Sequence, residues 1–319
     1  MAGQVRVRVM VSGVNPTDWK VRKRAGRPKV EVPNQDGAGV VDAVGPGVSS
    51  VAVGDRVWLW DVAYLNGQGT AQELVTVPEE HVMALPDSAT YDQGASLGIP
   101  ALTAALALAS KFPPGRPLAP GALAGQVILV TGGAGAVGHA AIQLGRWAGA
   151  TVIATVSNPH KNELAAKAGA SHVIDYRRKD VARAVGAVAP EGVDLIVDVA
   201  VSENIDTDLK ILAPDGLIVS YALHDDPTVS VQIRPALTAN LRLRFLLTYT
   251  VSTVEKRAAL DAVQAALNAG ALGIGEDHGL PISRYPLSRT TDAHAAVRAG
   301  AIGKVLIDVP TRTPPPVAP

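Results

Sequence analysis

The residues most suggestive of a binding site form a glycine-rich turn that directly follows an apolar segment. Residues 127–131 read Val-Ile-Leu-Val-Thr, and the turn that comes next contains both a GxGxxG and a GxxGxxG spacing. A pyrophosphate approaches backbone N–H groups closely only where no Cβ intervenes, and a following helix directs its positive N-terminal end at the anion. The pattern predicts dinucleotide binding, with a glycine-rich turn of an unrelated α/β domain as the alternative. The candidate cofactor-binding residues are Gly132, Gly133, Gly135, Ala136, Val137 and Gly138.

The residues after the next expected strand, 151–156, indicate which dinucleotide is bound. NAD-binding folds place an acidic residue about 20 residues past the glycines to hold the ribose 2′-OH, whereas this chain has Ser157 there. Because no carboxylate repels a 2′-phosphate and Lys161 lies one helical turn further on, the sequence favours NADPH. Ser157-Asn158-Pro159 also has the pattern of a helix N-cap followed by proline, and a solvated helix face is the alternative for Lys161. Capping and phosphate binding are compatible.

Other kinds of catalytic constellation are missing from the sequence. The chain has no cysteine, which excludes disulfides, iron–sulfur clusters, zinc–thiolate sites and a cysteine nucleophile. Its seven histidines are scattered without an HExxH motif, and no GxSxG elbow is present. Hydrolysis therefore has no supporting motif, whereas nicotinamide redox chemistry does.

Length and composition indicate the number of domains, the kind of substrate and the location of the protein. A chain of 319 residues is long enough for two domains. The 29 basic residues balance the 29 acidic ones, so nothing favours nucleic acid or an anionic membrane, and a small-molecule substrate is expected. Residues 1–11 alternate like a strand instead of a secretory signal, and no apolar segment approaches the ~20 residues that span a bilayer. We therefore expect a cytoplasmic protein.

Two kinds of periodicity divide the chain. Residues 1–98 show short strands broken by turn residues, expected at 4–11, 38–44, 55–60, 71–77 and 81–85. A helix is expected at 100–110, followed by a Pro/Gly-rich surface loop at 111–125. From residue 126 strands and helices alternate, which is typical of an α/β, doubly wound parallel sheet. Expected strands there are 127–131, 151–156, 172–174, 193–199 and 216–221, with helices after the glycine turn and at 159–168, 179–188 and 205–212.

Residues 228–319 are expected to add elements to both domains. A strand is expected at 228–233, a Leu/Val-rich stretch covers 241–251, helices are expected at 253–269 and 291–299, and a final strand at 304–309. The Pro-rich tail 310–319 is expected to be extended and disordered. We expect a Rossmann cofactor domain at 99–250 and a second domain formed by 1–98 with 251–319.

Several further motifs occur in order along the chain besides the glycine turn. They are Asn15-Pro-Thr-Asp-Trp-Lys, Gln35-Asp-Gly-Ala-Gly-Val-Val, Val53-Gly-Asp-Arg-Val, Leu97-Gly-Ile-Pro-Ala-Leu-Thr-Ala, Asp206-Thr-Asp-Leu-Lys-Ile-Leu and Gly303-Lys-Val-Leu. In this order and spacing the chain resembles the zinc-free medium-chain dehydrogenases/reductases, in particular the NADPH:quinone oxidoreductases that include ζ-crystallin. The resemblance covers nearly the whole chain. It implies that the second domain is a mainly β, GroES-like catalytic domain. The family's N-terminal β-hairpin has no counterpart among the expected strands.

The resemblance also assigns roles to residues. Zinc-dependent members have cysteine where Asn15 stands and a His-Glu pair where Gln35-Asp36 stands, so it implies no zinc. It implies that Asn15 and Thr103 lie near the nicotinamide and that Ser157, Lys161 and Tyr176 surround the 2′-phosphate.

The resulting hypothesis is hydride transfer from NADPH to a quinone or similar electron-poor acceptor, in a cleft between the two domains. Solvent or Tyr64 would supply the proton. The alternatives are an enoyl or 2-alkenal reductase and a low-turnover NADPH-binding protein. The stretch 241–251 corresponds to the segment through which family members pair their cofactor sheets, so a homodimer is expected.

Overall fold

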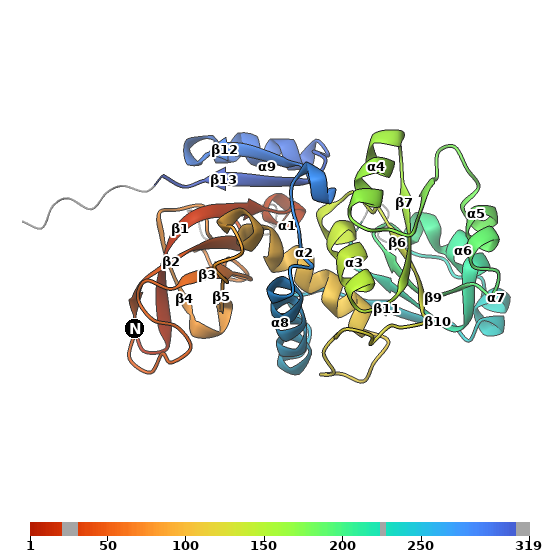
Figure 1. Ribbon diagram of the computed structural model, residues 1–319, viewed down its shortest axis with the longest axis horizontal. Coiled ribbons are helices and arrows are strands. Elements are labelled where there is room, and N and C mark those ends of the chain that lie inside the picture. The colour runs from red at the N-terminus through yellow and green to blue at the C-terminus, as the bar shows by residue number, and fades with distance from the viewer. Residues whose placement is uncertain (21–30, 224–227, 311–319) are drawn as a thin grey trace, which may run out of the picture. The chain divides into compact units, whose positions relative to one another are not determined.

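The computed structural model describes residues 1–20, 31–223 and 228–310. The chain divides into two compact units, one formed by residues 1–99 with 282–319 and the other by residues 100–281 (Figure 1). Within the described ranges no helix combines the length and apolarity needed to cross a membrane. The predicted disorder of the tail concerns residues 311–319, which lie outside the described residues.

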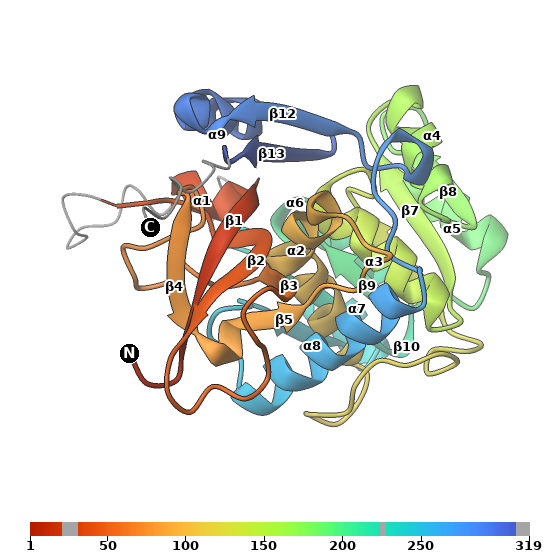
Figure 2. The same ribbon diagram turned by 60° about the vertical axis from the view of Figure 1, so that its left-hand side comes forward.

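A seven-stranded sheet forms the first unit (Figure 2). Val5, Val7 and Val9 alternate inward along β1 and pack with other valines into an apolar core. The expected strands are confirmed, and an additional edge strand, β12, pairs with β13. The sheet order is β12-β13-β1-β2-β3-β5, with β4 also paired to β1. The strands are β1 (Gln4–Val14), β2 (Asp36–Val44), β3 (Arg56–Leu59), β4 (Leu74–Pro78), β5 (Val82–Ala84), β12 (Ile282–Pro286) and β13 (Lys304–Asp308).

Short helices complete this unit. α1 (Pro16–Lys20) directly follows β1, and α9 (Thr290–Arg298) lies beside β12 and β13 (Figures 1 and 2). Single 3-10 turns occur at Glu79–His81 and Leu287–Arg289. α1 was not expected, because five residues are too few for a periodic pattern to be seen.

The helix α2 (Tyr91–Ala109) runs from the first unit into the second and begins earlier than expected. The prediction that it starts at Pro100 was wrong. Gly98 has a non-helical backbone that divides α2 into two segments. Pro100 therefore falls in the first turn of the second segment, where its missing N–H has no acceptor to lose.

The second unit confirms the doubly wound parallel sheet. Every strand pair in it is parallel, and the order is β11-β10-β9-β6-β7-β8. Its strands are β6 (Val127–Thr131), β7 (Thr151–Val156), β8 (His172–Asp175), β9 (Val193–Asp198), β10 (Leu212–Ser220) and β11 (Arg242–Phe245).

Helices cover both faces of this sheet. α5 (Val181–Val188) and α6 (Val201–Ile211) lie side by side and pack against the face that carries Leu129, Ile153 and Ile196 (Figure 1). α3 (Ala136–Trp147) packs on the opposite face, where a Cβ at Gly145 would lie 3.0 Å from Val152. α4 (Pro159–Lys167) contacts β7 and β8. The strands are buried on both sides, which explains their unbroken apolar sequences.

Residues 228–251 depart from expectation. The predicted strand at 228–233 was wrong: Val229 and Val231 pack against the α5–α6 core without joining a ladder, and α7 (Ile233–Thr238) follows. In the 241–251 stretch only Arg242–Phe245 forms a strand. Alternating apolar residues produce a strand only where a neighbouring strand edge is available.

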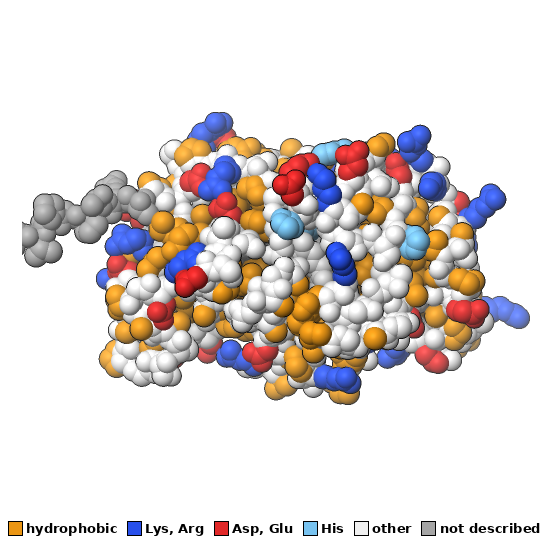
Figure 3. Space-filling view, viewed as in Figure 1, with side chains coloured by type: hydrophobic (Ala, Val, Ile, Leu, Met, Phe, Trp, Pro, Cys, Tyr) orange, Lys and Arg blue, Asp and Glu red, His pale blue; other side chains and the backbone are white. Residues whose placement is uncertain are grey.

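The helix α8 (Thr253–Asn268) contacts α3 and belongs to the second unit, as does the 3-10 turn Glu276–His278. The sequence-based boundary at residue 250 would assign α8 to the first unit. On the face shown in Figure 3, basic and acidic side chains are interspersed, in keeping with the balanced composition.

Candidate functional site

The glycine turn connects β6 to α3, and its tight backbone explains its glycines. Gly132 adopts a left-handed conformation with φ of 67°, which residues with a Cβ rarely adopt. A Cβ at Gly138 would lie 2.3 Å from the Gly132 carbonyl oxygen, and one at Gly133 would lie 2.9 Å from the Ala154 methyl group. The turn therefore tolerates no side chain at either position.

The start of α3 has N–H groups available to an anion. Gly135 is the N-cap, is exposed, and offers no side chain to cap the helix. The N–H groups of the first turn, including those of Ala136 and Val137, have no acceptor within the helix. β6 lies between β7 and β9, so the turn sits where the chain order of the strands reverses. Such switch points are where doubly wound sheets bind nucleotides.

Ser157, Lys161 and Tyr176 gather at the carboxyl ends of β7 and β8. Val156 pairs with Asp175, so Ser157 and Tyr176 directly follow two partnered residues. The Lys161 ammonium donates to the Ser157 hydroxyl at 3.2 Å, and the Tyr176 side chain is 49% exposed. A hydroxyl, a cation and an exposed phenol thus lie at adjacent strand ends with no acidic residue among the three.

The N-cap interpretation of 157–159 is confirmed. The Asn158 side-chain oxygen accepts the Lys161 backbone N–H at 2.9 Å, and Pro159 occupies the first turn of α4. Capping by Asn158 uses the Lys161 backbone and leaves the Lys161 side chain beside Ser157.

A buried carboxyl pair behind the glycine turn was not anticipated. Asp198, at the end of β9, accepts hydrogen bonds from the Thr131 hydroxyl at 2.9 Å and from the Ala200 N–H at 2.6 Å. Burial, and secondly the Asp198 charge, raise the pKa of Asp208 to about 10, so Asp208 is protonated at neutral pH. The available sequence signal was an acidic residue at the end of the apolar strand Val193–Asp198.

In the first unit, Asn15 is held in a buried polar cluster. The Lys304 ammonium donates to Asn15 Oδ1 at 2.8 Å, and Asn15 Nδ2 donates to Asp36 Oδ2 at 2.6 Å. The Lys304 ammonium also lies 3.4 Å from Asp36 Oδ2. Asn15, Asp36 and Lys304 all have exposed fractions of 3% or less. Asn15 directly follows β1, Asp36 begins β2 and Lys304 begins β13.

Burial is the largest influence on the pKa values of this cluster, in which Lys304 and Asp36 form an ion pair. It lowers the pKa of Lys304 and raises the pKa of Asp36, while the attraction between the two charges opposes both effects. Asp18 accepts the Asn15 backbone N–H at 2.7 Å, and burial followed by repulsion from Asp36 raises the pKa of Asp18 to about 8. Sequence reasoning did not single out Asp18 or Lys304 as site residues. A lysine at the start of an apolar strand was the signal for Lys304.

The residues at the family's zinc-ligand positions do not fit a zinc ion. The Gln35 side-chain oxygen instead accepts the Ala63 N–H at 2.8 Å. Asn15 and Asp36 are already bonded to the Lys304 ammonium, whose positive charge would repel a second cation. Zinc prefers thiolate, imidazole and carboxylate ligands, and this set offers one carboxylate.

The other predicted site residues have different surroundings. The Thr103 hydroxyl, on α2 in the second unit, is hydrogen-bonded to the Thr248 hydroxyl at 2.6 Å, and both side chains are buried. Tyr64 is half-buried in the loop between β3 and β4 of the first unit. Asn15 and Tyr64 thus belong to one unit, and Thr103 belongs to the other.

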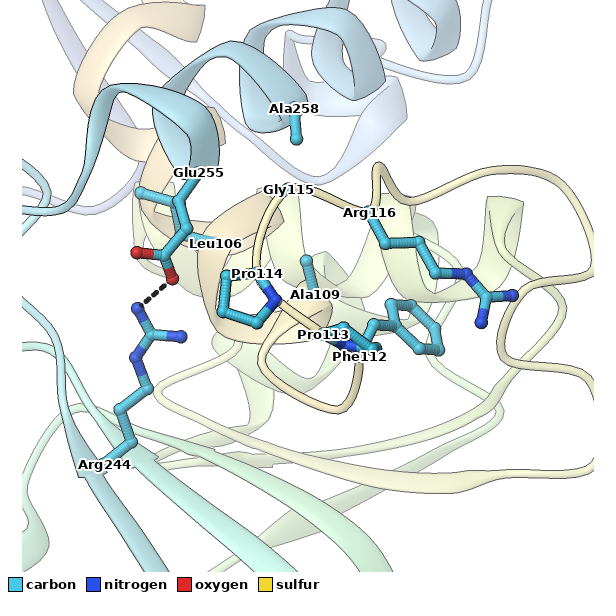
Figure 4. Close-up of a pocket in the computed structure, with 10 residues that line it drawn as sticks. All are labelled: Leu106, Ala109, Phe112, Pro113, Pro114, Gly115, Arg116, Arg244, Glu255 and Ala258. Carbon is cyan, nitrogen blue, oxygen red and sulfur yellow. Dashed lines mark hydrogen bonds and ion pairs between the residues drawn. The ribbon is translucent and has the colours of Figure 1, made fainter.

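The second unit also contains a recess beside α2 and α8 (Figure 4). It is lined by Leu106, Ala109, Phe112, Pro113, Pro114, Gly115, Arg116, Arg244, Glu255 and Ala258, and Arg244 pairs with Glu255 at 2.7 Å. The loop that borders it leads into the amino end of β6, and Lys111 donates to the Asp194 carbonyl near the start of β9. The recess therefore adjoins the amino ends of the strands, opposite the glycine turn.

Fold and glycine turn together define a dinucleotide-binding protein of the dehydrogenase class. Residues 1–87 match the alcohol dehydrogenase GroES-like domain, and residues 136–265 match the zinc-binding dehydrogenase family. The chain is 30% identical over 312 residues to quinone oxidoreductase of Sus scrofa, covering 95% of this chain and 88% of that one.

Two solved structures have the same fold. A mycobacterial protein complexed with NADPH is 28% identical, with a TM-score of 0.78 over 96% of this chain and 91% of that one. Escherichia coli quinone oxidoreductase complexed with NADPH is 23% identical, with a TM-score of 0.76 over 96% and 91%, and shows the fold alone. The chain belongs to the zinc-free quinone oxidoreductase branch of the medium-chain dehydrogenases/reductases and is an oxidoreductase.

Proposed function

We propose that this protein transfers hydride from NADPH to a quinone or a similar electron-poor acceptor without a metal ion. The observation that carries the proposal is the group of Ser157, Lys161 and Tyr176 at the ends of β7 and β8. An acidic residue, which would favour NAD, is replaced there by a hydroxyl beside a cation. The quinone oxidoreductase relatives and the NADPH complex of a 28% identical structure support the assignment.

The second unit holds the cofactor. The glycine turn and the N–H groups of Ala136 and Val137 bind the diphosphate, and Lys161 neutralises the 2′-phosphate with help from Ser157 and Tyr176. NADPH supplies a hydride equivalent when bound. The chain itself contributes binding, orientation and electrostatic stabilisation, since a quinone is already polarised and needs no Lewis acid.

Three side chains are assigned to the reacting region. Asn15 and Thr103 orient the nicotinamide or the acceptor carbonyl. Thr103 does so with a hydroxyl whose direction is set by Thr248. Solvent or the Tyr64 hydroxyl supplies the proton.

Steady-state NADPH oxidation with a panel of quinones, 2-alkenals and enoyl thioesters tests this assignment. Fast turnover with quinones supports it, whereas a strong preference for enals or thioesters would make the protein a double-bond reductase. Tight NADPH binding without turnover above background for any acceptor would contradict the enzymatic proposal and favour a low-turnover binding protein.

We also propose that the protein is a homodimer formed through the β11 edge of the second unit. Phe245 at the end of this edge strand and Leu247 just beyond it are exposed, and Ile233 and Leu237 of α7 are about 70% exposed. An unpaired apolar edge is a template for association with a second copy. Sedimentation velocity at micromolar concentration should show a dimer, and a stable monomer would contradict the proposal. Cytoplasmic localisation also stays a prediction, to be tested by fractionation.

A further inference from the structure

The side-chain amide of Asn15 is held from both ends by groups of opposite hydrogen-bonding character. Its Oδ1 accepts from the Lys304 ammonium at 2.8 Å, and its Nδ2 donates to Asp36 Oδ2 at 2.6 Å. An ammonium can only donate, and an ionised carboxylate can only accept. Rotating the amide by 180° would place two donors against each other and two acceptors against each other, so one orientation is selected.

This orientation leaves one polar group of Asn15 available. Nδ2 carries two N–H bonds, and Asp36 accepts one of them. In residues 1–20, 31–223 and 228–310 the second N–H has no acceptor. Asn15 can therefore offer an N–H donor to a ligand, but its carbonyl oxygen is already engaged by Lys304.

The Lys304 side chain is closely packed beside Gly13 of β1. A Cβ at Gly13 of β1 would lie 3.2 Å from Lys304 Cε and 2.0 Å from the Ala95 carbonyl oxygen. The contact with the Ala95 carbonyl oxygen excludes a side chain at position 13, and the lysine stem packs directly beside this glycine. The side chain of Lys304 is 1% exposed and that of Asp36 is fully buried, so the pair is shielded from water and from screening ions.

We propose that Lys304 is a positioning residue that fixes Asn15 as an N–H donor to the acceptor oxygen that becomes negatively charged during hydride transfer. This inference rests on the proposed function. The acceptor gains the hydride and is reduced, its carbonyl oxygen gains the displaced electron pair and then a proton from water or Tyr64, and NADPH is oxidised to NADP⁺. Lys304 polarises the Asn15 amide from its oxygen side, which strengthens the N–H as a donor when that negative charge develops. Lys304 thus contacts Asn15 and Asp36, two residues that the resemblance aligns with metal ligands of zinc-dependent members.

A neutral double variant tests this role without leaving a buried charge unpaired. In Lys304→Met/Asp36→Asn both charges are removed together. Because the Ile99 N–H donates to Asp36 Oδ1 at 2.9 Å, the amide introduced at position 36 keeps its oxygen there and turns its NH₂ towards Asn15. The Asn15 amide is then expected to invert and point its oxygen at position 36.

Kinetics of this variant are compared in two backgrounds. With Asn15 present, we expect kcat for a quinone to fall by about 10- to 100-fold, while KM and NADPH affinity change little. With Asn15→Ala already in place, the same double change should lower kcat by less than about 2-fold. An equal loss in both backgrounds, or no loss in either, would overturn the proposal, since Lys304 would then not act through Asn15.

A matched control comes from the second buried network of the same unit. His294 is buried and bonded to Asn34 at 2.7 Å, and its network reaches Asp36 at the backbone carbonyl, through Ser12 and Thr70, and not at the carboxylate that contacts Asn15. His294→Gln should lower the unfolding temperature and leave kcat near the wild-type value. A loss of kcat in this control as large as that of the double variant would indicate general destabilisation and contradict a specific role for Lys304.

A spectroscopic readout separates this proposal from the proposed function. The Asn15 side-chain amide signals in a ¹⁵N-labelled protein are identified by their loss in Asn15→Asp. We expect one strongly hydrogen-bonded amide proton in the wild type and a marked shift in Lys304→Met/Asp36→Asn. Unchanged signals would overturn the locked amide even if quinones are reduced. A shift without turnover of any acceptor would refute the proposed function and leave the locked orientation standing.

Discussion

The Lys161 ammonium donates a hydrogen bond to the Ser157 hydroxyl at 3.2 Å, one helical turn away and at the carboxyl end of β7. Both groups can donate to a phosphate, and the Asn158 cap starts the helix that carries Lys161. We therefore expect the preference for NADPH over NADH to be concentrated in this short segment.

Replacing Lys161 by alanine should remove most of this preference. A charge-assisted hydrogen bond contributes about 1.5–3 kcal/mol, so the KM for NADPH should rise by roughly 10- to 100-fold, while the KM for NADH changes little. Lys167→Ala, at an exposed cation of the same helix, is the control and should affect neither cofactor. Equal changes for NADPH and NADH in Lys161→Ala would refute the 2′-phosphate assignment.

Capping and phosphate binding should be separable at Asn158. Its side chain accepts the Lys161 backbone N–H, and its removal in Asn158→Ala should lower the free energy of unfolding by about 1 kcal/mol. Asn158→Asp keeps the cap and adds a negative charge beside Ser157. It should therefore retain stability but weaken NADPH binding relative to NADH. Chemical denaturation and cofactor titration measure the two effects, and loss of stability in both variants would contradict the separation.

Stability should depend on pH through His139. This residue lies on α3 with Nε2 2.8 Å from the His278 carbonyl oxygen, and burial lowers the pKa of His139 to about 4. Between pH ~4 and the unfolded-state value of ~6.5 the unfolded chain binds the extra proton. The contribution of His139 to the free energy of unfolding is thus fully present above pH ~6.5. It declines towards pH ~4 by a total on the order of 3 kcal/mol.

His139→Gln should reduce that acid loss, because glutamine can still donate to the His278 carbonyl but does not titrate. Urea denaturation at about pH 5 and about pH 7.5 measures the difference. His172→Gln, at an exposed histidine that begins β8, is the control. If the free energy of unfolding of His139→Gln depends on pH in the same way as that of His172→Gln and the wild type, the buried His139 does not cause the acid loss of stability.

The Asp198 and Asp208 pair predicts a stabilising substitution. Because the folded-state pKa of Asp208 is about 10, the folded chain retains a proton that the unfolded chain loses above pH ~4. Stability from Asp208 therefore falls as the pH rises through this range. An amide does not titrate and can still donate towards Asp198, so Asp208→Asn should raise the free energy of unfolding at pH ~8 by roughly 2–4 kcal/mol.

The gain should shrink towards pH ~4, where Asp208 is protonated in both states. Asp206→Asn provides the comparison on the same helix, since the Asp206 carboxylate bonds to Gln232 on the surface. Denaturation curves at both pH values measure the free energy of unfolding of the two variants and the wild type. A loss of stability in Asp208→Asn that is as large at pH ~8 as at pH ~4 would show that Asp208 is charged in the folded chain.

Local features of the chain were predictable because short stretches determine them. The glycine turn needs glycines wherever it is folded, since its carbonyls and neighbouring methyl groups leave no space for a Cβ. Alternation of apolar strands and helices predicted the parallel sheet, and β7 formed over the expected residues 151–156. Ser157 and Lys161 meet because they lie one turn apart on one segment. The sequence was sufficient where partners are close along the chain.

Other features depend on partners that are far apart in sequence, and only tertiary structure decided them. Apolar and polar residues alternate at 228–233 as in a strand. This segment does not pair with a strand edge, and its valines pack against α5 and α6 instead. Asn15 and Lys304 are 289 residues apart, and they meet because β1 pairs with β13 with Val14 opposite Val305. By itself the sequence determined the class of protein and the absence of cysteine ligands, and it predicted the cofactor segment. The folded chain decided which way the Asn15 amide points, because that direction is set by two charges brought together only when the sheet forms.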